Sequence, residues 1–302
     1  MREEEMIHEI ARLRTERNAV ILVHNYQIAE VQEIADFVGD SLELSIKATK
    51  VPDADIIVFC GVHFMAETAK LLSPDKLVLI PDPKAGCPMA DMITADDLRK
   101  LKAEHPGVPV VCYVNSSAAV KAESDICCTS ANAVKVVRSL DAEEVIFVPD
   151  KYLGSWVQRH TEQHLILWPG YCPTHNRIVP AHIQAMRAAH PHAEVMVHPE
   201  CMPDTIDAAD HVVSTGGMVR LARESATKEF IVATEEGMLH RLRKDNPDKQ
   251  FYHVTPVAVC PNMKKTTLEK VLWSLQKLQY EITVPAEIAD AARRAIQRML
   301  VV

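Results

Sequence analysis

Three cysteines in this sequence stand in the same local context and could together bind one metal centre. Cys87, Cys172 and Cys260 each precede a proline, and each follows an apolar run that also ends at a proline. Such a run predicts a buried strand that leads into a loop, and the proline after each cysteine stiffens that loop. Three thiolates, one from each third of the chain, fit a zinc site with one more ligand or an iron–sulfur cluster.

The wide spacing of these cysteines favours the cluster. Structural zinc sites usually take paired ligands from short loops, but this sequence contains no Cys-x2-Cys, and His175 is the one nearby second candidate. Single ligands suit a cluster whose fourth iron lacks a protein thiolate and is free to act as a Lewis acid. The remaining cysteines have no equivalents in the other thirds and are predicted to be small buried hydrophobic residues. They are Cys60, Cys112, Cys127, Cys128 and Cys201.

Polar residues recur at a fixed interval of 17 residues in the three thirds. The pairs are His24 and Ser41, Tyr113 and Ser130, and His198 and Thr215. The second member of each pair stands where a helix is expected to begin, so it could cap that helix or help its N-terminus to bind an anion. Tyr26, Asn115 and Glu200 also follow the first strand of their third and offer acid, base and hydrogen-bonding groups.

The elements that must position these residues repeat in the same order. The predicted strands cover 19–27, 55–61 and 76–81, then 108–115, 143–150 and 164–169, then 193–200, 228–234 and 251–256. They alternate with helical segments, which predicts three repeated αβα sandwich domains with about four parallel strands each. Ligands of such sheets bind beyond the carboxyl ends of the strands, so these ends should face a common centre. We expect domains at 1–105, 106–191 and 192–302, the first with an N-terminal helix and the last with C-terminal helices.

The composition and charge of the chain argue against membrane, secreted and nucleic-acid-binding proteins. The chain has 302 residues, 48% of them hydrophobic and 25% charged, and it contains neither a transmembrane run nor the apolar core of a signal peptide. We therefore expect a cytoplasmic protein without a membrane partner. A net charge of −8 argues against a nucleic-acid surface. Nucleotide binding is also unsupported, since no P-loop or Gly-x-Gly-x-x-Gly is present among nine glycines.

Nine segments in order along the chain resemble those of the quinolinate synthase family. They are VHNYQ (23–27), GDS (39–41), GCPMADM (86–92), CYVNSS (112–117), CTSAN (128–132), WPGYCPTH (168–175), VHPEC (197–201), STGGM (214–218) and CPNMKKTTLE (260–269). The resemblance implies three domains around a pseudo-threefold axis with a [4Fe–4S] cluster at the bottom of a central cavity. It also implies condensation of iminoaspartate with dihydroxyacetone phosphate to quinolinate, phosphate and two waters, in the pathway to NAD. The supplier of iminoaspartate would be L-aspartate oxidase or aspartate dehydrogenase.

The resemblance also assigns roles to individual residues. Cys87, Cys172 and Cys260 would hold the cluster and leave one iron open. The residues implied to bind substrate are His24, Ser41, Tyr113, Val114, Asn115, Ser130, His175, His198, Pro199, Glu200 and Thr215. We expect Glu200 to be the main general base, with Tyr26, His24 and His198 assisting proton transfer. Some family members carry a Cys-x2-Cys-x2-Cys near the last ligand; this sequence reads Cys260-Pro-Asn-Met263, so a thiol switch built on that motif is absent.

Three other functions compete with this interpretation. A hydro-lyase with a substrate-binding cluster would use the same cysteines without a phosphate site. A non-catalytic cluster sensor would be expected to carry a basic DNA-binding element, which the net charge of −8 disfavours. A structural zinc protein would be distinguished by metal analysis and visible absorption.

Overall fold

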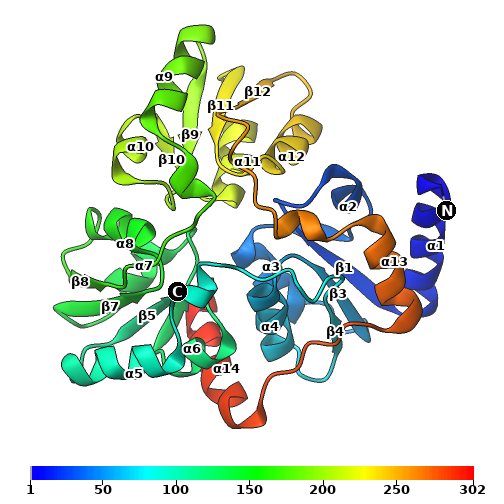
Figure 1. Cartoon of the computed structure of the whole chain (residues 1–302), viewed down its shortest axis with the longest axis horizontal. Coiled ribbons are helices and arrows are strands. Elements are labelled where there is room, and N and C mark those ends of the chain that lie inside the picture. Colours follow the sequence, from blue (N-terminus) through cyan, green and yellow to red (C-terminus); the bar gives the residue numbers. More distant parts are fainter. Residues whose placement is uncertain (1) are drawn as a thin grey trace.

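The chain folds into three small parallel sheets with helices on their faces, arranged around a common centre (Figure 1). The computed structural model describes residues 2–302. In that part of the chain each sheet has four strands, and the order is the same in all three: the second strand of the unit, then the first, third and fourth. This repetition confirms the predicted fold class of three αβα units.

The strands follow the predicted runs closely. The first sheet holds β1 (Ala19–His24), β2 (Phe37–Gly39), β3 (Ile56–Cys60) and β4 (Leu77–Leu79); the second holds β5 (Val110–Tyr113), β6 (Ile126–Cys128), β7 (Glu144–Val148) and β8 (His164–Leu167); the third holds β9 (Glu194–Val197), β10 (His211–Val212), β11 (Glu229–Ala233) and β12 (Gln250–His253). The sequence patterns did not locate β2, β6 and β10. Each has only two or three residues, too few to show a strand period.

Helices connect the strands on both faces of each sheet. They are α1 (Glu3–Glu16), α2 (Ala29–Glu33), α3 (Ser41–Thr49), α4 (His63–Leu72) and α5 (Ala95–Glu104); α6 (Ala118–Ala122), α7 (Ala133–Arg138), α8 (Lys151–Gln158) and α9 (Pro180–Ala189); and α10 (Pro203–Asp207), α11 (Thr215–Glu224), α12 (Met238–Asp245), α13 (Leu268–Lys277) and α14 (Ala286–Leu300). Among the helices of residues 2–302, none combines the length and apolar character that a membrane crossing requires.

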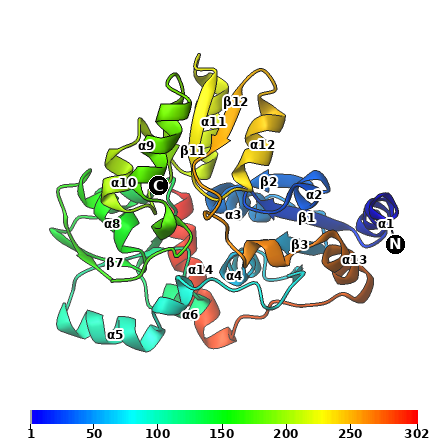
Figure 2. The same cartoon turned by 45° about the horizontal axis from the view of Figure 1, so that its top comes forward.

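The helix that follows each cysteine loop packs against the next unit around the ring. Thus α5 contacts α6 of the second unit, α9 contacts β11 of the third, and α13 contacts α1 and β3 of the first (Figure 1). The last helix, α14, lies against α4, α6 and β6 and so joins the first two units (Figure 2). These contacts tie the three small sheets together. The division of the sequence at 105/106 and 191/192 stays a prediction.

Candidate functional site

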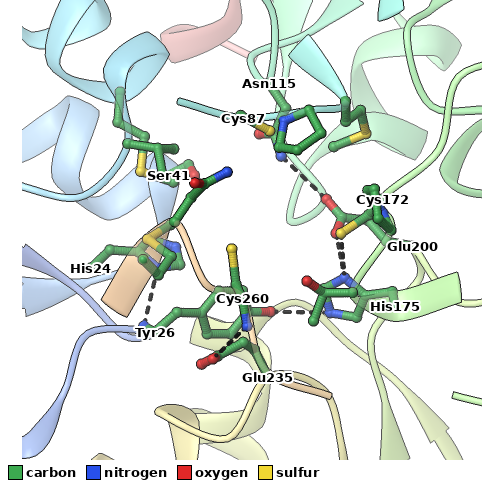
Figure 3. Close-up of a pocket in the computed structure, with 18 of the residues that line it drawn as sticks. His24, Tyr26, Ser41, Cys87, Asn115, Cys172, His175, Glu200, Glu235 and Cys260 are labelled. Atoms are coloured by element: carbon green, nitrogen blue, oxygen red, sulfur yellow. Dashed lines mark hydrogen bonds and ion pairs between the residues drawn. The ribbon is translucent and has the colours of Figure 1, made fainter. Parts of the chain in front are cut away.

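The three units meet at a cavity of about 210 Å³ that opens at the carboxyl ends of the strands. Side chains from all three units line it (Figure 3). The predicted site residues that form its wall are His24, Tyr26, Ser41, Cys87, Tyr113, Asn115, Ser130, Cys172, His175, His198, Glu200, Thr215 and Cys260. Two others, Val114 and Pro199, are buried nearby and are not part of this wall.

The three Cys-Pro loops share a local structure that directs backbone donors at the sulfur. A 3₁₀ turn begins three residues after each cysteine; these turns are η1 (Ala90–Met92), η2 (His175–Arg177) and η3 (Met263–Lys265). The first N–H of each turn donates a hydrogen bond to the sulfur, which lowers the pKa of the thiol. Burial is the larger effect and raises the pKa of Cys87 to about 12. These thiols should therefore ionise when a bound cation offsets the cost of burying the negative charge of the thiolate.

Ser41 and Thr215 are the first residues of α3 and α11, not their caps. The caps are Asp40, whose carboxylate accepts from the backbone N–H of Glu43, and Ser214, whose hydroxyl accepts from Gly217. The alternative role of helix capping is therefore wrong for both residues. Ser130 precedes Asn132, the N-cap of α7, and its hydroxyl lies 3.2 Å from Nε2 of His198.

Asp40 is a site residue that sequence reasoning missed, although it stands in the GDS motif. Its buried carboxylate also accepts a hydrogen bond from the backbone N–H of Gly216 in α11. A Cβ at Gly216 would lie 2.5 Å from Oδ2 of Asp40, so this approach requires glycine. One carboxylate thus joins the N-termini of α3 and α11, which both reach the cavity wall through Ser41 and Thr215.

Glu200 is a buried carboxylate of the cavity wall that accepts hydrogen bonds from three side chains. Its Oε1 accepts from the phenol of Tyr113 at 2.6 Å and from the amide of Asn115 at 3.3 Å. Its Oε2 lies 2.7 Å from Nδ1 of His175. Burial by itself raises the pKa of Glu200, but His175, His198 and the Tyr113 hydrogen bond outweigh it and lower the pKa. Glu200 is therefore a buried carboxylate at neutral pH.

Two histidines and two tyrosines of the cavity are uncharged at neutral pH. Burial lowers the pKa of His24 and of His198 to about 3, so both rings are neutral imidazoles. Burial also raises the pKa of Tyr26 and of Tyr113 well above the usual range of a phenol. Because His198 is neutral, we attribute the lowered pKa of Glu200 mainly to His175 and Tyr113. These neutral groups offer both donors and acceptors to a polar ligand.

A second group of residues missed from the sequence holds the Cys260 loop. Glu235, which is fully buried after β11, accepts from the backbone N–H of Cys260 at 3.0 Å and of Gly237 at 2.8 Å. Nζ of Lys264 lies 2.9 Å from the same carboxylate and donates to the carbonyl of Tyr26. The repeat contained a signal for this residue, because a buried acid, Asp150, also follows the third strand of the second unit.

Three potential ligand groups also lie close together on one side of the cavity. Sγ of Cys172, a ring nitrogen of His175 and a carboxylate oxygen of Glu200 are within 4.8 Å of one another. Nδ1 of His175 stands between the other two, 3.1 Å from the sulfur and 2.7 Å from Oε2 of Glu200. This set could hold a single metal ion, or it could be a hydrogen-bonded group beside a larger centre that uses Cys172.

The fold and the site define an α/β enzyme whose cavity gathers three thiols and the carboxylate of Glu200 from different units. Residues 8–301 match the family described as quinolinate synthetase A protein. The chain is 61% identical over 293 residues to the quinolinate synthase of Dehalococcoides mccartyi strain 195, covering 97% of each chain. It is 55% identical over 302 residues to that of Geobacter sp. strain M21 and 54% identical to that of Methanosarcina barkeri, covering 100% of this chain and 99% of each relative. The chain belongs to the quinolinate synthetase A protein family.

Proposed function

We propose that this protein is a cytoplasmic quinolinate synthase that condenses iminoaspartate with dihydroxyacetone phosphate in the biosynthesis of NAD. The products are quinolinate, phosphate and two waters. Family membership and the names of the relatives support this activity. The observation that carries the proposal is that Cys87, Cys172 and Cys260, from three separate sheets, line one cavity together with Glu200. L-Aspartate oxidase or aspartate dehydrogenase would supply the unstable imine.

The donor set of the cavity fits an iron–sulfur cluster. Cys87, Cys172 and Cys260 are partly exposed and unpaired, and each receives a backbone N–H at its sulfur. These three thiolates would hold a [4Fe–4S] cluster with one open iron. When bound, the cluster would supply a Lewis acid for a hydroxyl or carboxylate oxygen of the substrate.

Glu200 is the residue best placed to remove a proton from the substrate. Its carboxylate is ionised, lines the cavity and is oriented by hydrogen bonds from Tyr113, Asn115 and His175. A carboxylate has about four acceptor positions, and these bonds occupy three of them. The remaining position on Oε2 is available for a proton from a substrate carbon or nitrogen. Tyr26, His24 and His198 would move further protons as neutral donors or acceptors.

The N-termini of α3 and α11 would bind the negative charges of the two substrates. Both helices begin at the cavity with a hydroxyl residue, Ser41 in one and Thr215 in the other. The Asp40 carboxylate already accepts from the backbone N–H groups of Glu43 and Gly216. The hydroxyls of Ser41 and Thr215 are therefore the donors that remain for a substrate carboxylate or phosphate. Arg177 is the one lysine or arginine in the cavity wall formed by residues 2–302. Anion binding here would therefore depend mainly on these hydroxyl groups and on Arg177.

An anaerobic assay tests the activity directly. Purified protein is supplied with oxaloacetate, ammonia and dihydroxyacetone phosphate, while quinolinate, phosphate and iron are measured in parallel. We expect equal amounts of quinolinate and phosphate, with about four irons per chain. In a parallel assay with a hydroxy acid alone, loss of water without dihydroxyacetone phosphate would instead identify a hydro-lyase. An iron-loaded protein that forms no quinolinate would refute the proposal.

Replacing Glu200 tests its role as the base. Glu200→Gln keeps the shape and most hydrogen bonds but cannot accept a proton. We expect the visible absorbance of the cluster to remain and kcat to fall by roughly 10²- to 10⁴-fold. Quinolinate formation at the normal rate in this variant would contradict the assignment.

The close group of Cys172, His175 and Glu200 favours one competing site, a mononuclear zinc centre. Metal analysis after anaerobic purification separates the two possibilities. One zinc per chain, without visible absorption, would support the mononuclear site. About four irons with broad visible absorption would exclude it as the resident centre.

A further inference from the structure

Asn25 is a buried asparagine that stands between two cavity residues without lining the cavity itself. Its neighbours His24 and Tyr26 form part of the wall, whereas the side chain of Asn25 is fully buried and contacts the third unit. Nδ2 of Asn25 lies 3.0 Å from the hydroxyl oxygen of Thr215, the first residue of α11. Oδ1 of Asn25 lies 2.8 Å from Nη1 of Arg241 in α12. The amide therefore joins a charged side chain to a hydroxyl of the cavity wall.

The chemistry of arginine determines which way this amide faces. A guanidinium has only N–H donors and stays charged, so the atom of Asn25 that faces Arg241 must be the carbonyl oxygen. The NH2 group of Asn25 must then face Thr215 and donate to its hydroxyl oxygen. Within residues 2–302 this is the one hydrogen bond that the Thr215 hydroxyl makes. Its own hydrogen thus remains for an acceptor in the cavity that Thr215 lines.

We propose that Asn25, held by Arg241, is a positioning residue that makes Thr215 a hydrogen-bond donor toward a negatively charged oxygen of the substrate. This inference rests on the proposed function and deepens it, because it assigns a direction to one of the hydroxyl groups proposed to bind the substrate. A reversed amide, or a carboxylate at position 25, would instead accept the hydrogen of Thr215. The hydroxyl would then offer only lone pairs to the cavity, which a carboxylate or phosphate oxygen cannot use.

The surrounding chain holds both partners of this contact in place. The backbone N–H of Asn25 donates to the carbonyl of Gly39 at 3.1 Å, and its carbonyl accepts from Nε2 of Gln32 at 3.1 Å. Nη1 of Arg241 donates at 2.8 Å to the carbonyl of Val38 as well as to Asn25. The amide therefore cannot turn over without placing its NH2 group against a fixed, buried donor, and an unpaired buried donor is costly.

Asn25→Asp keeps the size of the side chain and replaces the donor to Thr215 by an acceptor. The new carboxylate pairs with Arg241, so we expect the protein to fold and to keep its iron. KM for iminoaspartate or for dihydroxyacetone phosphate should rise by roughly 10- to 100-fold, as for the loss of a hydrogen bond to a charged group. The value of kcat should stay within about threefold, because the lost bond is made to bound substrate and transition state alike.

Varying each substrate in turn in the quinolinate assay identifies the group that Thr215 binds. A rise in KM for dihydroxyacetone phosphate assigns its phosphate to Thr215, and a rise in KM for iminoaspartate assigns a carboxylate. Either result supports the inference, because both groups present negatively charged acceptor oxygens.

Thr215→Val separates the direction of the hydrogen bond from the added charge of Asn25→Asp. Valine has no hydroxyl, so this variant should show a similar rise in KM. Adding Asn25→Asp to Thr215→Val should then raise KM by less than about twofold more, since both changes remove the same donor. If the new negative charge repelled the substrate directly, the double variant would lose the full factor again.

Two variants of Arg241 test whether the guanidinium sets the direction of the amide. Arg241→Met removes every donor, so the Asn25 amide can face Thr215 in either orientation and the same KM should rise by roughly 3- to 10-fold. Arg241→Lys keeps a group that only donates. It should hold KM within about threefold of the unchanged protein, because a single nitrogen of Arg241 makes both bonds.

Asn246→Asp is the matched control for the change of amide to carboxylate. Asn246 is also buried, and its Nδ2 donates to the carbonyl of Leu242, but it is not part of the cavity wall. This variant should lower the melting temperature and leave both KM values unchanged.

The outcomes of this experiment are distinct. If the unchanged protein forms no quinolinate, the proposed function fails. If the unchanged protein is active and Asn25→Asp leaves both KM values normal, the role of Asn25 alone is overturned. A full further loss on adding Asn25→Asp to Thr215→Val, or a fall in kcat without a change in KM, would also overturn it, because neither result follows from the direction of the Thr215 hydrogen bond.

Discussion

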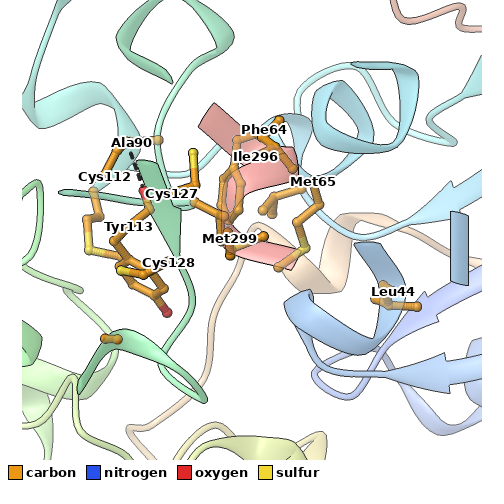
Figure 4. Packing of buried hydrophobic residues seen from close by; sticks show 14 of the residues in the cluster. Leu44, Phe64, Met65, Ala90, Cys112, Tyr113, Cys127, Cys128, Ile296 and Met299 are labelled. Atoms are coloured by element: carbon orange, nitrogen blue, oxygen red, sulfur yellow. Dashed lines mark hydrogen bonds between the residues drawn. The ribbon is translucent and has the colours of Figure 1, made fainter. Parts of the chain in front are cut away.

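The cysteines of the cavity and the cysteines of the second sheet show that a raised thiol pKa alone does not distinguish a ligand from a core residue. Cys112, Cys127 and Cys128 lie in β5 and β6, fully buried, where β6 packs against α14 (Figure 4). Burial raises the pKa of Cys128, as it raises that of Cys172 in the cavity. Both thiols are thus neutral in the unliganded protein.

The difference between the two groups lies in what surrounds each sulfur. In the cavity, a 3₁₀ turn supplies a backbone N–H to each thiol, and all three side chains face one shared space. In the sheet, the neighbours are aliphatic or aromatic side chains, including Ile296 and Met299 of α14 (Figure 4). Cys112 differs from the other sheet cysteines. Burial raises its pKa, but hydrogen bonds with Cys127 and Ser116 and the charge of Lys121 outweigh burial and lower the pKa to about 7. Hydrogen-bond donors and a shared cavity, together, mark the cysteines that we propose as ligands.

Removing one cavity cysteine should have the largest effect on bound iron and on activity. Cys172→Ala should abolish bound iron and quinolinate formation, because a cluster with two protein thiolates is not retained. Iron analysis and visible absorption after anaerobic purification provide the measurement. A Cys172→Ala protein that keeps its full iron content would show that this cysteine is not a ligand.

Neutralising Glu235 tests the surroundings of a cavity cysteine. It changes the carboxylate that accepts from the backbone N–H of Cys260 and leaves the thiol itself unchanged. Glu235→Gln leaves the Lys264 ammonium without its buried partner and should destabilise the protein by roughly 3–5 kcal/mol. It should also reduce the iron retained, since the backbone N–H of Cys260 loses a carboxylate acceptor. Thermal unfolding and iron counts measure both effects. Glu236→Gln, at an exposed neighbour, is the control; equal behaviour of the two variants would contradict a role for Glu235 in holding the loop.

Removing a sheet cysteine should have the smallest effect. Cys128→Ala deletes one buried sulfur and should lower the free energy of unfolding by about 1 kcal/mol. Iron content and kcat should equal those of the unchanged protein. Denaturant unfolding and the quinolinate assay provide the measurement. Loss of iron in Cys128→Ala would mean that the sheet cysteines contribute to the metal centre after all.

Much of the fold could be predicted because its units repeat. Apolar runs stopped by proline located the fourth strands and their cysteines, and the 17-residue interval joined the end of each first strand to the start of a helix. The prediction that five cysteines are core residues is also confirmed, since Cys60, Cys112, Cys127, Cys128 and Cys201 are fully buried. The short second strands escaped detection, because their pairing depends on neighbouring strands and not on their own residues.

The sequence by itself determined where each unit begins its strands, which residues end them, and therefore which side chains reach the common edge. Only the tertiary structure decided which of these side chains meet. The hydroxyl of Thr234 lies 2.5 Å from the phenol oxygen of Tyr26, although the two residues are 208 positions apart in the sequence. The carboxylate of Asp40 accepts a hydrogen bond from Gly216 in α11, across more than half of the chain. The packing of α13 on the first sheet likewise closes the ring between distant ends of the sequence. Hydrophobic periodicity encodes local structure, whereas contacts between units depend on how three separately formed sheets pack together.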